Sequence, residues 1–394
     1  MKKISATFIY IRRFIWQRVK PFSVWLSKLI GVHLLDKNQT KDYLKSYQLS
    51  AIPGYQSTLP TVVDASDFNK ILFKDTPIRV EPSYVWRVEI PDKNATMFRC
   101  GSILLNHKLL LTDYTHDAFL NPFIRNKRKP YQAKTLIAPW SQYFEHTPPG
   151  YQYHRYIKFG GYYDFVMLLA AKLSRIKDAL SEEVLSQSII AYPLLNTAYE
   201  QDFLALLGFK PDQIPDSRLH SASFDTCVLG DSDSWCYPNV ADLLSLKKNV
   251  EERLQVERTN QNRIYVRRAG RRRVLNEEDL IRLLEQYDFT IIDDVPRPVA
   301  EQVSIYRNAT FILGPHGASF SNIIWCEPGT HLFELFNADY VPNYYLYLSQ
   351  MLSMRYSAYC LGETVSNNAD ALSADIVISI TEVDRCLRKF LVTA

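Results

Sequence analysis

The chain has 394 residues, of which 47% are hydrophobic and 22% charged, and its formal net charge is +4. This length leaves room for two domains with a large core, and the composition is typical of a globular protein rather than a low-complexity or repeat protein. Its six cysteines lack metal-ligand spacing, which is typical of free thiols in a cytosolic protein.

The first thirty residues carry seven Lys or Arg and no acid, with aromatic and aliphatic side chains between them. They lack both the run of about 18 apolar residues of a spanning helix and the apolar core and cleavage site of a signal peptide. Two interpretations stay open: a solvated leader, or a basic amphipathic helix on an anionic membrane surface. The second predicts a protein at the inner face of the plasma membrane, with residues 1–35 as the leader and 1–30 as the membrane contact.

The chain before residue 260 alternates between predicted strands and helices. Residues 84–112 predict several short strands, and YYDFVMLLAAKLSRIKDAL (162–180) predicts an amphipathic helix. A strand in SIIAYPL (188–194) precedes a helix in AYEQDFLALLGF (198–209), and residues 239–256 predict a helix that bridges two halves. We therefore predict an N-terminal α/β domain at 36–245 and a C-terminal one at 246–394.

The second half has a more regular pattern, with a helix that opens at Pro298 between the predicted strands FTIIDDV and FIL. Its predicted strands are RIYVRR (263–268), FTIIDDV (289–295), FIL (311–313) and THLFELF (330–336). NEEDLIRLLEQY (276–287) predicts its first helix. Strands that alternate with helices of about 10 to 15 residues predict a parallel sheet with helices on both faces. The fold class predicted is therefore α/β, with two domains that face a cleft.

A glycine-rich turn follows the predicted strand 311–313. In an open parallel sheet, ligands bind beyond the carboxyl ends of the strands. Gly314 and Gly317 would let the backbone approach a ligand, and the helix expected from Ala318 would offer N–H groups to an anion such as phosphate. His316, between the glycines, is also compatible with a simple tight turn.

Six arginines lie within residues 263–273, at the end of the first strand of the same predicted sheet. Such a run is often only a solvated surface, and it tempts an assignment to nucleic acid. The run is short and has no nucleic-acid-binding motif around it, so we expect no nucleic-acid partner. Arginine forks bind diphosphates, which makes Arg267 and Arg272 candidates that act with the glycine-rich turn.

Two further polar residues belong to this candidate site. Asn322, one turn into the predicted helix, can reach toward the same opening. Glu334 lies in the apolar strand LFELF, where a carboxylate needs a partner such as a ribose hydroxyl or an arginine. The run nearest to a DxD motif, at 231–233, lies in a polar loop rather than at a strand end, so we expect no metal and no other cofactor.

Together these motifs resemble glycosyltransferase family 61, the capsular-polysaccharide type found in bacteria and also in eukaryotes. The resemblance is dense from 263 to 336 and is weaker before 240, where it rests on GGYYDFV and LLGFKPDQI. The matching residues, in order, are Arg267, Arg272, Asn276, Glu277, Glu301, Gln302, Gly314, His316, Gly317, Asn322 and Glu334.

The resemblance implies a GT-B-like fold with two Rossmann-like domains, an inverting mechanism, and a nucleotide-sugar donor held by the second domain. The acceptor would be a growing surface polysaccharide or lipid-linked glycan, as in capsular, exopolysaccharide or lipopolysaccharide synthesis. The implied donor-binding residues are Arg267, Arg272, Gly314, His316, Gly317, Ala318, Asn322 and Glu334.

An inverting transfer needs a general base, which we expect from the first domain, and positive groups on the leaving diphosphate. Asp164 is our first choice of base, where many family members carry a histidine, and Asp113, His116 and Asp117 are the alternatives. Two other functions stay open: a polysaccharide-modifying transferase of the pyruvyl or phosphoryl type, and a non-catalytic subunit that binds nucleotide sugars or glycans.

Overall fold

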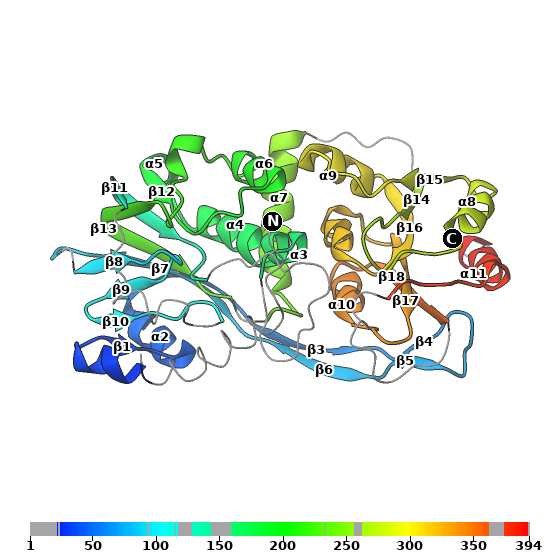
Figure 1. Cartoon of the computed structure of the whole chain (residues 1–394), viewed down its shortest axis with the longest axis horizontal. Helices are drawn as coiled ribbons and strands as arrows, with labels where there is room; N and C mark the ends of the chain where they lie inside the picture. The colour runs from blue at the N-terminus through cyan, green and yellow to red at the C-terminus, as the bar shows by residue number, and fades with distance from the viewer. Residues whose placement is uncertain are drawn as a thin grey trace, which may run out of the picture.

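The structure is a computed structural model, and it describes residues 22, 24–92, 94–114, 116, 128–142, 159–232, 234–255, 262–361 and 374–392. In this part of the chain, two five-stranded sheets with helices around them lie along the long axis of the molecule (Figure 1). The predicted α/β class is confirmed. All six cysteines are free, as expected.

The N-terminal half is built on a mixed sheet. Its strands, from edge to edge, are β12 (Ser188–Ile190), β11 (Lys129–Ala138), β13 (His220–Gly230), β7 (Ser83–Glu89) and β2 (Gln48–Ile52). The first three are parallel, whereas β7 pairs antiparallel with both β13 and β2. A smaller sheet beside it consists of β1 (His33–Leu34), β10 (Lys108–Leu109), β9 (Ile103–Leu105) and β8 (Ala95–Met97).

One helical stretch forms the centre of this half. It runs through α3 (Tyr162–Asp164), the π-helical segment η3 (Phe165–Ala170) and α4 (Ala171–Asp178), and every residue from 163 to 176 is buried. The predicted helix is therefore present, but it has no exposed polar face from 163 to 176, because α4 packs between β13 and the bridging helix α7 (Val240–Leu254). The remaining helices here are α2 (Lys37–Leu44), η1 (Lys45–Tyr47), α5 (Glu182–Ser186), α6 (Ala198–Leu206) and η4 (Pro211–Gln213).

The C-terminal half contains the predicted parallel sheet. Its strands are β15 (Phe289–Ile292), β14 (Asn262–Val266), β16 (Ala309–Pro315), β17 (His331–Asn337) and β18 (Arg355–Leu361), and every pair is parallel. Helices α8 (Glu277–Glu285) and α11 (Ile380–Val392) pack on one face. The other face is covered by α9 (Val299–Arg307), η5 (Ala318–Trp325) and α10 (Tyr344–Met351).

The order of these strands fixes where a ligand can bind. β14 comes first in the chain, β15 is added on one side of it, and β16 is added on the other. This reversal leaves a crevice at the carboxyl ends of β14 and β16, which is where open α/β sheets bind their ligands. The arginine-rich loop after β14 and the glycine-rich turn after β16 both begin at this point.

The two halves share one hydrophobic core, in which the rings of Phe203 and Trp325 stack with centroids 6.2 Å apart. An arm also crosses from the first half to the second (Figure 1). It contains β3 (Tyr55–Leu59), β4 (Val62–Val63), β5 (Ile71–Phe73) and β6 (Thr76–Val80). At its far end, the Asp64 carboxylate accepts a hydrogen bond from the Cys360 backbone N–H at 3.1 Å. No pattern in residues 55–80 had predicted this arm.

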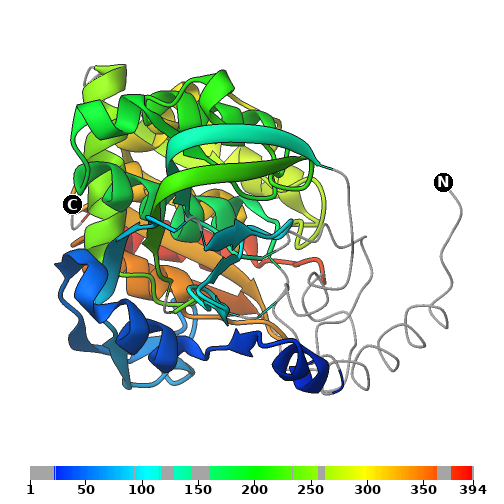
Figure 2. The same ribbon diagram turned by 90° about the vertical axis from the view of Figure 1, so that its left-hand side faces the viewer.

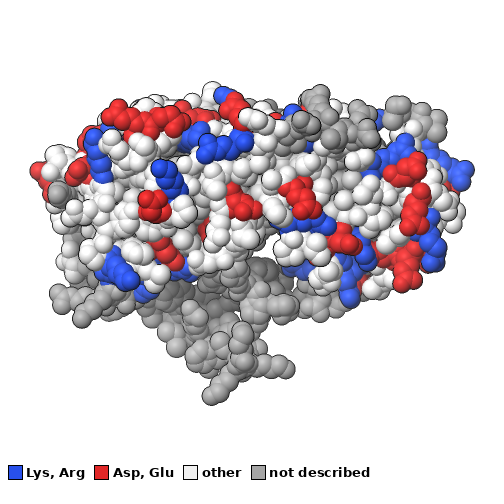
Figure 3. Space-filling view, turned by 90° about the horizontal axis from the view of Figure 1, so that it is seen from above, with Lys and Arg blue, Asp and Glu red and all other residues white. Residues whose placement is uncertain are grey.

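Two surface features bear on the predicted partners. Figure 2 shows the helical residues 24–29 at the lower edge of the N-terminal half, beside the small sheet. On the face that Figure 3 shows, basic and acidic side chains of the described residues are interspersed. Among those residues, no helix is long and apolar enough to cross a membrane.

Candidate anion-binding site

The arginine-rich loop and the glycine-rich turn touch at the crevice of the C-terminal sheet. Arg268 Nη1 donates a hydrogen bond to the backbone oxygen of His316 at 3.3 Å, and its Nε donates to the Arg271 oxygen at 2.9 Å. A Cβ on Gly317 would lie 1.3 Å from Arg268 Nη1, so only glycine leaves room for this guanidinium. The prediction that the two motifs meet is confirmed.

Arg272 is the most unusual residue of the loop. It is 5% exposed, its Nε is enclosed without a hydrogen-bond partner, and no described carboxylate forms an ion pair with it. Its backbone has φ 57°, a left-handed conformation that costs an arginine energy. Its guanidinium lies over the Tyr340 ring, 5.3 Å from the centroid. A buried cation without a counter-charge is costly, so this position favours an anionic ligand.

Two more arginines concentrate positive charge around Arg272. Burial, together with the charges of the neighbouring Arg268 and Arg271, lowers the pKa of Arg272 to about 10. Neither neighbour forms an ion pair with a carboxylate of the described residues. Three guanidinium groups within one loop thus offer several N–H donors to a diphosphate.

The turn after β16 supplies backbone donors. η5 begins at Ala318 as expected, as a 3₁₀ helix without a side-chain cap. The Phe320 N–H already donates to the Gly317 oxygen at 3.0 Å, so the N–H groups of Ala318 and Ser319 are the ones that remain open to a ligand. Gly314 has a different role from the one predicted. A Cβ there would lie 2.6 Å from the Val266 oxygen and 3.2 Å from Phe320 Cζ, so this glycine lets protein elements, not a ligand, come close.

The imidazole ring of His316 is held by the buried carboxylate of Glu334. Its Nδ1 lies 2.5 Å from Glu334 Oε1, and the Tyr356 hydroxyl donates to Glu334 Oε2 at 2.6 Å. Glu334 is 0% exposed. The expectation that this carboxylate needs a partner is confirmed, but the partners are a histidine and a tyrosine rather than an arginine or a ribose.

Asn322 makes all its hydrogen bonds within the protein. Its Oδ1 accepts from the Tyr162 hydroxyl at 2.8 Å and from Trp325 Nε1 at 3.0 Å, and its Nδ2 donates to Gln302 Oε1 at 2.9 Å. Because Tyr162 belongs to the first half, Asn322 joins the two halves. The structure does not bring it to the arginines as a free ligand-binding group.

Arg267 also has protein partners. Its Nε and Nη2 form a fork on Glu277 Oε2, at 3.1 and 2.7 Å, and its Nη1 donates to Asp293 Oδ1 at 2.8 Å. These contacts fasten the end of β14 to the start of α8 and to the loop after β15. The geometry therefore favours a structural role for Arg267 and leaves the ligand to Arg272.

We expect Arg267→Ala to lower the free energy of unfolding by about 1 kcal/mol, because its two ion pairs are partly exposed. Affinity for a nucleoside diphosphate should change by less than about 3-fold, since this guanidinium is already occupied. Thermal unfolding and calorimetric titration measure the two effects. A selective loss of nucleotide binding without a change in stability would return Arg267 to the ligand site.

Asp164, the first choice of base, is buried beside an aromatic cluster at the boundary of the halves. Its Oδ2 accepts from the Gly160 and Gly161 backbone N–H groups at 2.9 and 3.0 Å, and Trp235 Nε1 donates to Oδ1 at 2.6 Å. Burial raises its pKa, and these hydrogen bonds oppose the shift. The Trp235 ring lies 5.2 Å from Tyr344, which in turn lies 6.1 Å from the His316 ring.

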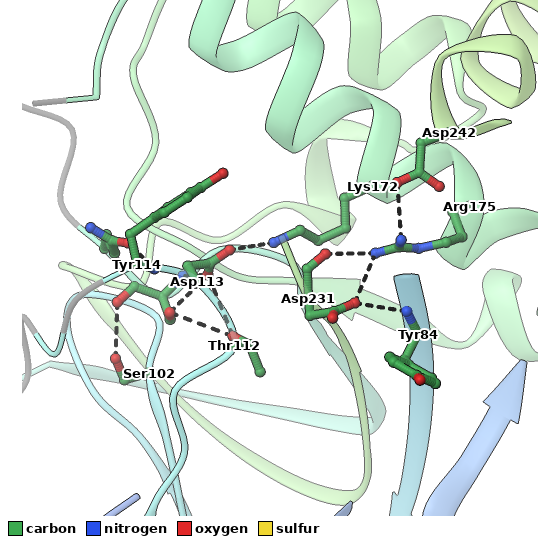
Figure 4. A network of polar contacts seen from close by, with 11 residues as sticks. Tyr84, Ser102, Thr112, Asp113, Tyr114, Lys172, Arg175, Asp231 and Asp242 are labelled. Atoms are coloured by element: carbon green, nitrogen blue, oxygen red, sulfur yellow. Dashed lines mark hydrogen bonds and ion pairs between the residues drawn. The ribbon is translucent and has the colours of Figure 1, made fainter. Parts of the chain in front are cut away.

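Asp113 lies in a different place, within a buried network of charged side chains (Figure 4). It is ion-paired with Lys172 and accepts from the Ser141 N–H at 2.9 Å. Arg175 extends the network, donating to Asp242 Oδ2 at 2.9 Å and to the Asp231 backbone oxygen at 2.7 Å. Burial lowers the pKa of Lys172, and Asp113 opposes this shift. The arrangement is that of a structural network.

The remaining alternatives for the base are also in the first half. One ring nitrogen of His116, Nε2, donates to the Leu35 backbone oxygen at 2.6 Å, which ties this loop to the N-terminal strands. Asp117 lies outside the described residues. The structure thus brings neither Asp113 nor His116 to the arginine cluster.

Sequence reasoning missed the aromatic wall of the site. Tyr340, Tyr344 and Tyr345 surround the His316 ring, with centroids 5.4, 6.1 and 5.3 Å away. The Tyr345 hydroxyl donates to the Gly317 oxygen at 2.8 Å and so fixes the turn. The signal was present as YVPNYYLYL at 340–348, directly after a strand of the parallel sheet. The described residues contain no group of three His, Cys, Asp or Glu side chains that could hold a metal ion.

Two comparisons with known proteins find glycosyltransferases. Residues 166–333 match the sequence model of the family described as Glycosyltransferase 61, a segment that includes the arginine loop and the turn from Gly314 to Gly317. A curated relative, the EGF domain-specific O-linked N-acetylglucosamine transferase of Drosophila melanogaster, is 33% identical over 88 residues. That alignment covers 22% of this chain and only 17% of the relative. Both comparisons relate the chain to glycosyltransferases, and residues 166–333 are similar to glycosyltransferase family 61.

Proposed function

We propose that this protein is a glycosyltransferase that takes a sugar from a nucleotide-sugar donor and transfers it to a glycan acceptor. The observation that carries the proposal is the buried guanidinium of Arg272, which has no described carboxylate partner and lies at the ligand-binding edge of a parallel sheet. The family match supports the same activity. The two α/β halves support a GT-B-like arrangement, with the donor on residues 246–394 and the acceptor on 36–245.

The proposed reaction is a single inverting displacement. The acceptor hydroxyl oxygen attacks the anomeric carbon, the bond from this carbon to the diphosphate breaks, and the hydroxyl proton passes to a base. Arg268, Arg271 and Arg272 hold the charge that grows on the leaving diphosphate, together with the open N–H groups at the start of η5. These groups are fixed before the reaction, so they need no reorganisation during it.

Asp164 remains the base that we propose. Its burial raises its pKa, which makes the carboxylate a stronger proton acceptor. Three donors occupy three of the roughly four lone-pair sites of the carboxylate, so one site is left for a substrate hydroxyl. A series of neighbouring rings, Trp235, Tyr344 and His316, connects it to the candidate anion site.

A panel of nucleotide sugars and nucleoside diphosphates tests the proposal. A ligand at 100 times its dissociation constant should stabilise the protein by about 2.7 kcal/mol, which a thermal unfolding assay detects. The matching nucleotide sugar should then be hydrolysed slowly without an acceptor. Binding without hydrolysis or transfer would indicate a non-catalytic subunit, and release of pyruvate or phosphate from another donor would indicate the other class of transferase.

For the acceptor we propose a glycan or lipid-linked glycan of a cell-surface polysaccharide, met at the inner face of the plasma membrane. Support comes from the described end of the leader, where Trp25 is 55% and Leu29 63% exposed beside Lys28. Large apolar side chains next to basic ones are stabilised at an anionic membrane surface. The Drosophila relative is by its name a transferase specific for EGF domains, so a folded protein domain is the alternative acceptor to assay.

We expect the full chain to sediment with vesicles of phosphatidylcholine and phosphatidylserine, and to bind them less as salt screens the charges over about 10 Å at 0.1 M. Trp25→Ala combined with Leu29→Ala should weaken this binding about 10-fold or more, because two apolar contacts are removed. Leu275→Ala is the matched control, since this leucine is also exposed but lies on the other half. Equal sedimentation of all three proteins would contradict a membrane contact through this helix.

A further inference from the structure

The contacts of Glu334 determine which proton the candidate site presents to a ligand. Glu334 lies on β17, which pairs with β16 and β18, and both its oxygens are engaged inside the protein. Oε1 faces Nδ1 of His316 at 2.5 Å, and Oε2 accepts from the Tyr356 hydroxyl at 2.6 Å. Whether Nδ1 donates to Oε1, or Oε1 donates to Nδ1, depends on where one proton sits.

The opposite edge of the imidazole is left for a ligand. Nε2 has no hydrogen-bond partner among the described residues, yet it is not one of their fully enclosed side-chain nitrogens. The ring is held in place by Phe336, which stacks on it at 5.5 Å, and by Tyr345 at 5.3 Å. The ring is therefore fixed, with one engaged and one open nitrogen, and it lies close enough to Arg268, Arg271 and Arg272 for their charges to act on it.

Burial favours a neutral pair. Burial, together with the charges of Arg272, Arg268 and Arg271, holds the pKa of His316 well below the usual range. Complete burial raises the pKa of Glu334 to about 8, while Tyr356 and Arg272 oppose the shift. The other titratable group that interacts with this carboxylate is Tyr345, a neutral phenol. At pH 7 the glutamic acid then holds a proton and the imidazole is uncharged.

We propose that Glu334 is a protonated carboxylic acid that donates to Nδ1 of His316 and thereby fixes the ring as the Nε2–H tautomer, a neutral donor to a phosphate oxygen of the ligand. The opposite tautomer would turn the Nε2 lone pair toward that oxygen and repel it. Tyr356 completes the arrangement, because its hydroxyl donates to the carbonyl oxygen of the acid. Glu334 and Tyr356 are positioning residues, and only the identity of the anion as a diphosphate rests on the proposed function.

The tautomer can be measured without any ligand. In the full protein labelled with ¹⁵N-histidine, the His316 resonances are assigned by their loss in His316→Gln. We expect Nε2 to carry the proton and Nδ1 to be unprotonated at pH 7, and the pattern to reverse as the pH rises past about 8. A proton on Nδ1 at pH 7 would overturn the proposal, whatever the protein does with nucleotides.

Glu334→Gln tests the same assignment through binding. Its amide N–H can donate to Nδ1 and its carbonyl can accept from Tyr356, so it reproduces the protonated acid and cannot ionise. We expect its affinity for the nucleoside diphosphate found in the panel to stay within about 3-fold of wild type at pH 7, and not to fall above pH 8 as that of the wild type should. Glu334→Leu, which frees the ring, should bind about 10-fold or more weakly at every pH.

Folding provides a third readout and a control. The folded protein keeps a proton on Glu334 that the unfolded chain releases above about pH 4.5, so the free energy of unfolding should fall as the pH rises from there to about 8. Glu334→Gln should lack this part of the fall. A folded Glu334→Gln protein that loses 10-fold or more in affinity at pH 7 would show an essential carboxylate and overturn the proposal. If the wild type binds no nucleoside diphosphate, the proposed function fails, while the ¹⁵N measurement still decides the tautomer.

Discussion

Replacing Arg272 with alanine is expected to weaken binding of the nucleoside diphosphate by about 10²-fold, equivalent to about 2.7 kcal/mol, and to leave nucleoside binding within about 3-fold. The difference arises because the guanidinium would bond the diphosphate, which the free nucleoside lacks. Removing the buried, uncompensated cation should not lower the stability of the unliganded protein, and can raise it. Calorimetric titration of the two ligands, with thermal unfolding beside it, measures these effects.

The adjacent Arg273 offers a matched control. It is exposed and paired with Asp375, whose Oδ2 accepts from Nη2 at 2.6 Å, so Arg273→Ala should leave both affinities within about 3-fold. Arg272→Lys should fall between wild type and Arg272→Ala, because an ammonium keeps the charge but loses the fork of donors. Equal losses for diphosphate and nucleoside in Arg272→Ala would contradict a diphosphate site at this loop.

Asp164→Asn is expected to reduce sugar transfer by at least about 10²-fold and to leave donor affinity within about 3-fold. An amide cannot take the proton of the acceptor hydroxyl, whereas the diphosphate contacts lie on the other half of the protein. Because burial raises the pKa of Asp164, wild-type kcat/KM should rise with pH as this carboxyl loses its proton, and this dependence should vanish in the variant. Initial rates over a pH series, with the donor saturating, measure both effects.

The structural role of Asp164 needs its own control, since the carboxylate also accepts from Gly160, Gly161 and Trp235. Trp235→Phe removes the donor to Oδ1 and keeps the carboxylate, so its effect shows what the loss of that hydrogen bond alone does. Rates should be compared well below the unfolding temperature of each protein. A fully active Asp164→Asn would move the role of base to Asp113, His116 or Asp117, each tested in the same way.

The sequence by itself determined the elements of the C-terminal sheet from residue 263 to 337 and the edge at which two motifs meet. The predicted strands and helices from residue 263 to 337 are all present, because hydrophobic periodicity and turn residues are local properties of the chain. A parallel sheet brings the carboxyl ends of neighbouring strands together, so two motifs that each follow a strand were bound to approach the same edge. The arginine loop and the turn around His316 could be placed there from the sequence for this reason.

Only the tertiary structure decided which side chains are free to act. Arg267 and Arg272 look equivalent in the sequence, yet Glu277 and Asp293 engage the first, while the second is buried without a described carboxylate partner. The two partners of Glu334 also come from elsewhere in the sheet, since His316 follows β16 and Tyr356 lies on β18. Such pairings join residues that are distant along the chain, and a long polar side chain can reach several of them. Local pattern therefore cannot choose among them, and the packing of the two halves makes the choice.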